Sequence, residues 1–185
     1  MKSNNFFLNN ISLFFLFIYL LLGLYVVKDF GISVDEEFQR YSGFYWLNYI
    51  VDFTSFENFK LNVSEKLNSI ESFTLPDPKN YKFYGVAFDL PLAFIETLIK
   101  LENPRDYFLL RHYANFLIFF ISSVYFFLII KKRFADKFLV FFGLVLYLSS
   151  PRIFGESFYN NKDIIFLSLV TITIYYFFRF LDKKN

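Results

Sequence analysis

Two adjacent carboxylates, Asp35 and Glu36, are the first residues in this chain whose types and spacing can do chemistry. They follow soon after a long uncharged stretch. Adjacent carboxylates can accept a proton from a hydroxyl group, or hold a divalent cation through their oxygens. Acids in the first turn of a helix also complement the helix dipole, and a third acid, Glu37, fits that structural role best. Both interpretations stay open on spacing alone.

A second polar segment, SPRIFGESFYNNKD, lies between two apolar runs near the end of the chain. Arg152 and Lys162 can bind a phosphate group, the first through bidentate contact and the second as a point charge. Glu156 and Asp163 can join Asp35 around a metal ion or a sugar. The alternative is a solvated loop whose basic side chains extend along apolar surface to reach water.

Arg111 and His112 precede another apolar run. Arg111 can bind a lipid phosphate, or simply anchor the chain among lipid headgroups. His112 is the only histidine, so no site with two histidine ligands can be built from this chain.

The amino-acid composition indicates the environment of the whole chain. Of 185 residues, 56% are hydrophobic, 25% are aromatic and only 19% are charged, and there is no cysteine. A soluble domain is about 25% charged. These values exclude a disordered chain, a disulfide scaffold and a cysteine-ligated metal site. The net charge of +2 gives no indication of nucleic-acid binding. We therefore expect a domain in a lipid bilayer.

Four apolar runs define the expected architecture, an all-α, multi-pass membrane protein with about four transmembrane helices. The runs are Ser3–Val27, Tyr113–Ile130, Phe138–Ser150 and Ile164–Phe178. The first is long enough to span a membrane and lacks the small-residue cleavage site of a signal peptide, the alternative reading. The last two runs are short. Flanking basic residues can extend them, or they enter the membrane only in part.

Basic residues set the expected orientation. Lys2, the cluster between Lys131 and Lys137, and the residues from Arg179 onward all fall on one side if there are four spans. That side is predicted to be the cytoplasm, so the N-terminus is cytoplasmic. Residues 28–111 and 149–163 then form the first and second outer loops of a single membrane domain, 1–185.

The first outer loop carries 13 acidic and 9 basic residues. Aromatic residues recur at three- and four-residue spacing over Asp35–Val51, which predicts an amphipathic helix. Such a helix lies either in the membrane interface or against the rest of the loop. The following segment, Asp52–Lys82, is predicted to be irregular, with one short helix near Val63–Ser72.

The last part of this loop, Tyr84–Leu101, is apolar again. A second interfacial helix is expected there, with Pro91 in its first turn and Asp89 upstream as its cap.

Three motifs in order give the chain a family resemblance: Asp35-Glu36, then Arg111-His112-x-x-Asn115-Phe116, then the SPRIFGESFYNNKD segment. The chain resembles the N-terminal part of the polytopic glycosyltransferases with the C-type membrane fold. Within these, it is similar to bacterial relatives of protein O-mannosyltransferases and of the aminoarabinose transferase of lipid A. Such enzymes have about a dozen spans and a C-terminal outer domain, so the chain is expected to be the N-terminal portion of a larger enzyme.

The resemblance implies transfer of a sugar from a polyprenyl-phosphate donor to a protein, lipid or glycan acceptor on the outer face of the cell (inner) membrane. Asp35 matches the acid that family members place near the acceptor, with Glu36 beside it. Cavity-lining acids of the second outer loop are implied to be Glu156 or Asp163. The residues implied at the donor phosphate are Arg111, Arg152 and Lys162. A divalent cation is left open as a cofactor. The alternative is a non-catalytic membrane subunit, or a protein that binds or translocates lipid-linked sugars.

Overall fold

The computed structural model describes residues 2–70, 75–81 and 85–183. Over these residues the protein is helical and has no strand. The prediction of an all-α protein is confirmed. The chain divides into two units, one made of Met1–Phe30 with His112–Asn185 and the other of Gly31–Arg111.

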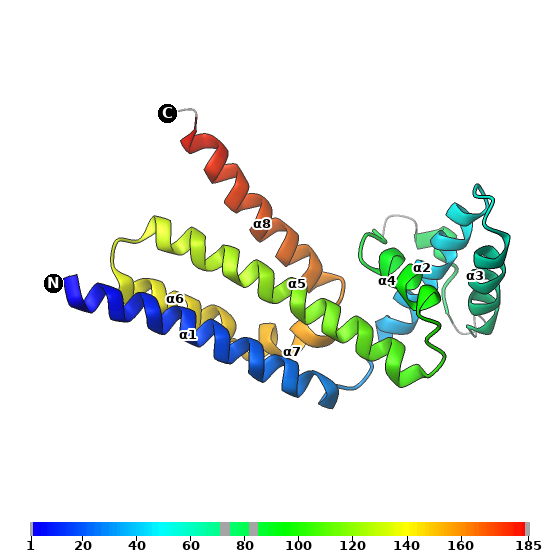
Figure 1. Cartoon of the computed structure of the whole chain (residues 1–185), viewed down its shortest axis with the longest axis horizontal. Coiled ribbons are helices and arrows are strands. Elements are labelled where there is room, and N and C mark those ends of the chain that lie inside the picture. The colour runs from blue at the N-terminus through cyan, green and yellow to red at the C-terminus, as the bar shows by residue number, and fades with distance from the viewer. Residues whose placement is uncertain (1, 71–74, 82–84, 184–185) are drawn as a thin grey trace. The chain divides into compact units, whose positions relative to one another are not determined.

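The first unit contains the long apolar helices. These are α1 (Lys2–Val26), followed by the short 3₁₀ turn η1 (Val27–Asp29), most of α5 (Pro104–Arg133), α6 (Lys137–Leu148), α7 (Pro151–Tyr159) and α8 (Asp163–Asp182). In this unit α1, α5 and α6 run alongside one another (Figure 1), and α8 contacts α5 through side chains, as in the rings of Tyr125 and Tyr175.

Aromatic stacking fixes α7 against the rest of this unit. The ring of Phe158, on α7, stacks on Phe30 with 4.2 Å between centroids and on Phe116 of α5 with 5.2 Å. Phe116 and Phe158 have no solvent exposure. Gly23 of α1 leaves room for the Phe116 ring of α5, because a Cβ there would lie 1.9 Å from that ring.

Three helices in the described residues are long and apolar enough to cross a membrane: Ile11–Asp29, Pro104–Arg133 and Asp163–Asp182. The pair α6 and α7 meets the same criterion together, although the two helices are bent by 55° at the break between them. By itself α6 is 12 residues long, about 18 Å, which is short of a hydrocarbon core of about 30 Å. Within the described residues there are thus three apolar helices of spanning length, or four spans if the bent pair counts as one.

The second unit is built from shorter helices: α2 (Val34–Val51), α3 (Glu57–Ser69), the 3₁₀ turn η2 (Pro78–Tyr81), α4 (Asp89–Leu98) and the first turns of α5. Its core is a small apolar cluster, Phe44, Leu47, Val51, Val63 and Ala93. The closest approach is at Gly43 of α2, where an added Cβ would lie 2.7 Å from the backbone oxygen of Asp89. Only a glycine lets α2 and α4 pack this closely.

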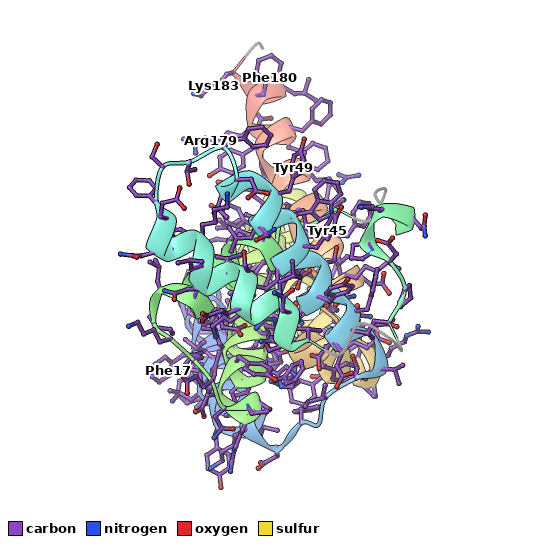
Figure 2. All side chains as sticks on the ribbon, turned by 90° about the vertical axis from the view of Figure 1, so that its right-hand side faces the viewer. Phe17, Tyr45, Tyr49, Arg179, Phe180 and Lys183 are labelled. Atoms are coloured by element: carbon purple, nitrogen blue, oxygen red, sulfur yellow. The ribbon has the colours of Figure 1, made fainter. Side chains whose placement is uncertain are left out.

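The two faces of α2 accommodate both interpretations of its aromatic pattern. One face packs on α3 and α4 through buried residues such as Phe44 and Leu47. The other carries edge-to-face rings, Tyr45–Trp46–Tyr49, which Phe53 continues just after the helix, and Tyr49 is 54% exposed. Figure 2 shows Tyr45 and Tyr49 along this helix.

One segment predicted as a loop is helical instead, and one predicted helix is longer. Residues 149–163, predicted as the second outer loop, are mostly α7, because Pro151 supplies a favourable first helical residue. The short helix predicted near Val63–Ser72 is α3, which begins at Glu57, six residues before the predicted start, and an acid in the first turn suits the helix dipole. The predicted end of that helix, Ser72, lies outside the described residues.

The predicted cap of α4 is wrong. Asp89 lies inside the first turn and is buried, and the residue at the cap position is Phe88. The helix therefore begins two residues before Pro91, the position around which it was predicted.

Candidate functional site

The acidic pair at the start of α2 divides into two different environments. Glu36 is 1% exposed, and its carboxylate accepts a hydrogen bond of 2.9 Å from the backbone N–H of Ser33. The Ser33 side chain in turn accepts from the backbone N–H of Glu36, which completes a capping box. Asp35, one residue earlier, is exposed. Glu36 therefore closes the helix end, whereas the Asp35 carboxylate faces solvent.

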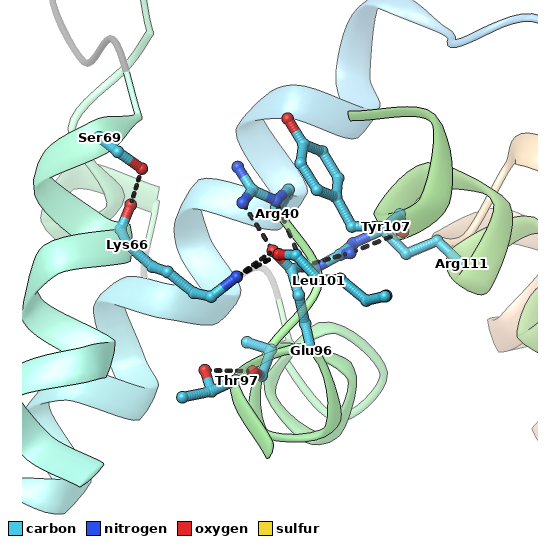
Figure 3. Close-up of polar contacts among 9 residues, drawn as sticks. Arg40, Lys66, Ser69, Glu96, Thr97, Leu101, Tyr107 and Arg111 are labelled. Carbon is cyan, nitrogen blue, oxygen red and sulfur yellow. Dashed lines mark hydrogen bonds and ion pairs between the residues drawn. The ribbon is translucent and has the colours of Figure 1, made fainter. Parts of the chain in front are cut away.

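A buried ionic cluster in the Gly31–Arg111 unit centres on Glu96, whose carboxylate has no solvent exposure. Arg40 donates from Nη2 to Oε1 at 2.7 Å and from Nε to Oε2 at 3.3 Å. Arg111 donates from Nη1 to Oε2 at 2.8 Å. The Nζ atom of Lys66 lies 3.5 Å from Oε1. Figure 3 shows these three cationic side chains converging on one carboxylate.

Four helices supply this cluster, since Arg40 is on α2, Lys66 on α3, Glu96 on α4 and Arg111 on α5. Arg111 Nη1 also donates to the backbone oxygen of Tyr107 at 2.9 Å. The guanidinium of Arg40 lies 3.8 Å from the centroid of the Tyr107 ring, a favourable cation–π geometry. The cluster thus ties every helix of the unit to its neighbours.

The electrostatics keep Glu96 ionised. Burial by itself raises the pKa of this carboxyl, but the hydrogen bonds and charges of Arg40 and Arg111 outweigh it, so the pKa lies below its ordinary value. A buried carboxylate surrounded by donors is a structural anchor and also leaves an excess of positive charge around it.

A hollow of about 480 Å³ opens beside this cluster. Its lining comes from α2, α3, the end of α4 and the start of α5: Arg40, Asn62, Glu65, Lys66, Ser69, Thr97, Lys100, Leu101, Glu102 and Tyr107. A second, smaller hollow of about 360 Å³ lies between α5 and α8. It is lined by apolar and tyrosine side chains of these two helices, with Arg179.

The residues predicted in the second outer loop form a local chain of contacts along α7. Arg152 Nε donates to Glu156 Oε1 at 2.9 Å, and Asn160 Nδ2 donates to Glu156 Oε2 at 3.1 Å. The same Asn160 nitrogen lies 3.2 Å from Asp163 Oδ2. The structure thus brings Arg152, Glu156 and Asp163 together around Asn160. Lys162, between them in sequence, is exposed.

Asn115 of α5 holds this segment in place. Its Nδ2 atom donates to the backbone oxygen of Ser157 at 3.0 Å, one of the last carbonyls of α7. These carbonyls have no partner inside their own helix. Asn115 belongs to the Arg111-His112-x-x-Asn115-Phe116 motif, so that motif supplies both a partner for Glu96 and a support for α7.

The predicted site residues therefore fall into separate groups. Asp35, Glu36 and Arg111 belong to the Gly31–Arg111 unit, and the α7 residues belong to the other. Arg111 is 1% exposed and engaged by Glu96. A shared cavity of Asp35 with Glu156 or Asp163 stays a prediction.

Sequence reasoning missed Arg40, Lys66 and Glu96. A signal for Glu96 was present, because it directly follows a run of apolar residues in α4, and a buried charge needs a partner. No local sequence pattern indicates Arg40 as its partner, because Arg40 is 56 residues away from Glu96 in the sequence.

Metal ligands are sparse in the part of the chain that the structure describes. No group of three or more histidine, cysteine, aspartate or glutamate side chains is placed to hold a metal ion there.

Comparison with known protein families, with curated proteins and with solved structures found no match for this chain.

Proposed function

We propose that this chain is the N-terminal portion of a membrane glycosyltransferase that transfers a sugar from a polyprenyl-phosphate donor to an acceptor on the outer face of the membrane. The observation that carries the proposal is the division of the acidic pair. The Glu36 carboxylate is part of the capping box that begins α2, whereas Asp35, on the same turn, is exposed to solvent. A solvent-exposed carboxylate that takes no part in the capping box suits a general base.

In this mechanism Asp35 accepts the proton of the acceptor hydroxyl as that oxygen attacks the anomeric carbon. The polyprenyl phosphate leaves from the opposite face as an anion. Arg152 and Lys162, both exposed, stabilise the charge that develops on the phosphate.

The other predicted residues act around this step. Arg111, on α5, contributes positive charge to the donor site, and its guanidinium is held in place by Glu96. Glu156 and Asp163 bind hydroxyl groups of the sugar or acceptor, or a divalent cation where one takes part.

Four spans with a cytoplasmic N-terminus, in the cell (inner) membrane, complete the proposal. Here α6 makes the third span, extended by the basic residues that flank it, and α7 lies in the second outer loop. Lys132, near the end of α5, forms an ion pair with Asp182, at the end of α8, so these two basic ends lie together. The start of α1, the turn between α5 and α6, and the end of α8 all lie toward one end of their unit (Figure 1). One basic end supports one cytoplasmic side, in contact with membrane lipids.

One observation favours a second candidate, a non-catalytic subunit that binds or translocates lipid-linked sugars. The Glu156 carboxylate already accepts hydrogen bonds from Arg152 and Asn160. These hydrogen bonds stabilise α7, and that structural role is enough to account for Arg152, Glu156 and Asn160 without catalysis.

The deciding experiment measures sugar transfer from a synthetic polyprenyl-phosphate donor by membranes of cells that carry the intact gene. Asp35→Asn is expected to abolish transfer while membrane insertion is retained. Glu37→Gln is the matched control, because Glu37 is exposed on the same turn, and it should keep transfer. Undiminished transfer by Asp35→Asn would remove the residue from catalysis and favour the non-catalytic candidate.

A further inference from the structure

The hollow of about 480 Å³ in the Gly31–Arg111 unit has no part in the proposed transfer reaction. A ligand-sized cavity lies between about 300 and 1,000 Å³. Its charged and amide-bearing lining residues are Arg40, Asn62, Glu65, Lys66, Lys100 and Glu102.

Basic residues are concentrated at this hollow, although the Gly31–Arg111 unit is acidic overall. Between residues 31 and 111 the sequence has 12 acidic and 8 basic residues, yet four of the basic ones lie in this hollow or in the cluster behind it: Arg40, Lys66, Lys100 and Arg111.

One carboxylate faces three of these cations. Glu96 is the shared partner of Arg40, Lys66 and Arg111. The Nε and Nη2 atoms of Arg111 are buried and have no hydrogen-bond partner among the described residues. Asp89 is a second buried acid, and its charge also acts on Arg111. Because three cations face these two acids, the group keeps a net positive charge that a bound anion would offset.

Lys100 brings a further cation to the hollow in a backbone conformation that lysine disfavours. Its φ is 54°, the only positive φ among the described non-glycine residues. It follows the end of α4 in a turn closed by Leu101 N–H to the Glu96 carbonyl and Lys100 N–H to the Thr97 carbonyl. Glycine or asparagine is the usual residue at this left-handed position. A lysine there costs stability and places a cationic residue in the lining of the hollow, a combination typical of functional sites.

We propose that this hollow binds a phosphate group carried by a hydroxylated small molecule or headgroup. Arg40, Lys66 and Lys100 face the phosphate oxygens, since guanidinium and ammonium groups are its usual partners. The exposed acids Glu65 and Glu102 accept hydrogen bonds from the hydroxyl groups, which explains the acids beside a phosphate site. This inference does not rest on the glycosyltransferase proposal, because the residues placed at the phosphate, Arg40, Lys66 and Lys100, have no role in the transfer step.

The test is isothermal titration calorimetry on the full chain in an uncharged detergent, with ionic strength held constant by potassium chloride. Glycerol 1-phosphate and inorganic phosphate are expected to bind, and glycerol is not. Lys100→Gly and Lys100→Asn fit the left-handed position, so they should unfold at the same or a higher temperature than the wild type while binding phosphate about tenfold more weakly, the loss expected for one charged hydrogen bond. Lys100→Arg keeps the charge and should keep the affinity.

Lys60→Gln is the matched control. Lys60 is on α3 like Lys66, but it pairs with Asp52 and does not line the hollow, so phosphate binding should not change. Absence of phosphate-dependent heat in the wild type would overturn the proposal, as would wild-type affinity in both Lys100→Gly and Lys100→Asn, or equal binding of glycerol.

A short-chain phosphatidic acid, below its micellar concentration, distinguishes the two sources of the phosphate. Tighter binding than glycerol 1-phosphate assigns the hollow to a lipid headgroup. Equal or weaker binding assigns it to a soluble phosphate ester.

Discussion

Arg111 and Glu96 form an ion pair almost completely removed from solvent. Nη1 and Oε2 are 2.8 Å apart, and the side chains are 1% and 0% exposed. Burying two charges costs more than their attraction returns unless further hydrogen bonds satisfy them. Arg40 provides those hydrogen bonds to Glu96. The pair therefore depends on α2, α4 and α5 being held together.

Glu96→Gln should destabilise the Gly31–Arg111 unit strongly. It leaves Arg40 and Arg111 buried without a compensating charge, a change that lowers the free energy of unfolding by about 3–5 kcal/mol. Unfolding by denaturant in an uncharged detergent can be followed through Trp46, the single tryptophan, which lies on α2 of this unit. Glu57→Gln, at an exposed position, should stay within about 0.5 kcal/mol of the wild type. Equal losses in the two variants would show that the pair contributes no specific stability.

The same carboxylate gives the unit a pH dependence of known sign. Arg40 and Arg111 hold the pKa of Glu96 below its ordinary value near 4.5 despite burial. Its stabilising contribution is therefore complete above the pKa of the unfolded chain and is lost as the pH falls through the lower pKa of the folded chain. The stability difference between the wild type and Glu96→Gln should be constant near neutral pH and shrink below about pH 4.5. A difference that grows on acidification would contradict this assignment.

Gly43→Ala should also destabilise this unit, for a steric reason. The added methyl group would lie 2.7 Å from the Asp89 backbone oxygen and 2.9 Å from its carbonyl carbon, so α2 and α4 must separate. Overpacking of this kind costs about 1–3 kcal/mol. Gly31→Ala is the control, because nothing lies within 4 Å of a Cβ at that position. If both variants unfold at the same denaturant concentration, the contact between α2 and α4 is not as tight as described.

Local patterns in the sequence predicted the helices better than the site. The aromatic spacing placed a helix at Asp35–Val51, and α2 runs from Val34 to Val51. The uncharged first run matched α1 closely. Hydrophobic runs and first-turn acids act within a few residues of each other, so they can be read directly from the order of residues.

Features that depend on distant residues could not be predicted in this way. Arg40, one of the three cationic partners of Glu96, lies 56 residues away from it in the sequence, and no local pattern marks it. The helix α7 was missed because Gly155 and the asparagines that follow it are typical of loops, whereas contacts of Phe158 with Phe30 and Phe116 stabilise the helix. The Ser33-x-x-Glu36 spacing, in contrast, was a readable capping box. It would have assigned Glu36, not Glu37, to the helix end.

Two substitutions of Glu36 separate capping from chemistry. Glu36→Gln can still accept the hydrogen bond from the Ser33 backbone, so stability and sugar transfer should both be retained. Glu36→Ala removes the cap and should lower the free energy of unfolding by about 1 kcal/mol. Both quantities can be measured on the same membranes and on the purified chain. Loss of transfer in Glu36→Gln with unchanged stability would give Glu36 a chemical role beside Asp35.

Asn115→Ala should loosen α7 without unfolding the apolar helices. The Ser157 carbonyl accepts from Asn115 at 3.0 Å, and the backbone N–H of Asn161, which would bond it if the helix continued, donates to Tyr159 instead. A buried carbonyl left without a donor costs about 1–3 kcal/mol. Hydrogen exchange of the α7 amides, followed by mass spectrometry in an uncharged detergent, should therefore accelerate. Thr173→Ala is the control, because that exposed hydroxyl bonds only within α8. If the α7 amides of Asn115→Ala exchange at the same rate as those of the control, the aromatic stacking of Phe158 alone holds the helix. The Arg111-His112-x-x-Asn115-Phe116 motif then does not position Glu156 and Asp163.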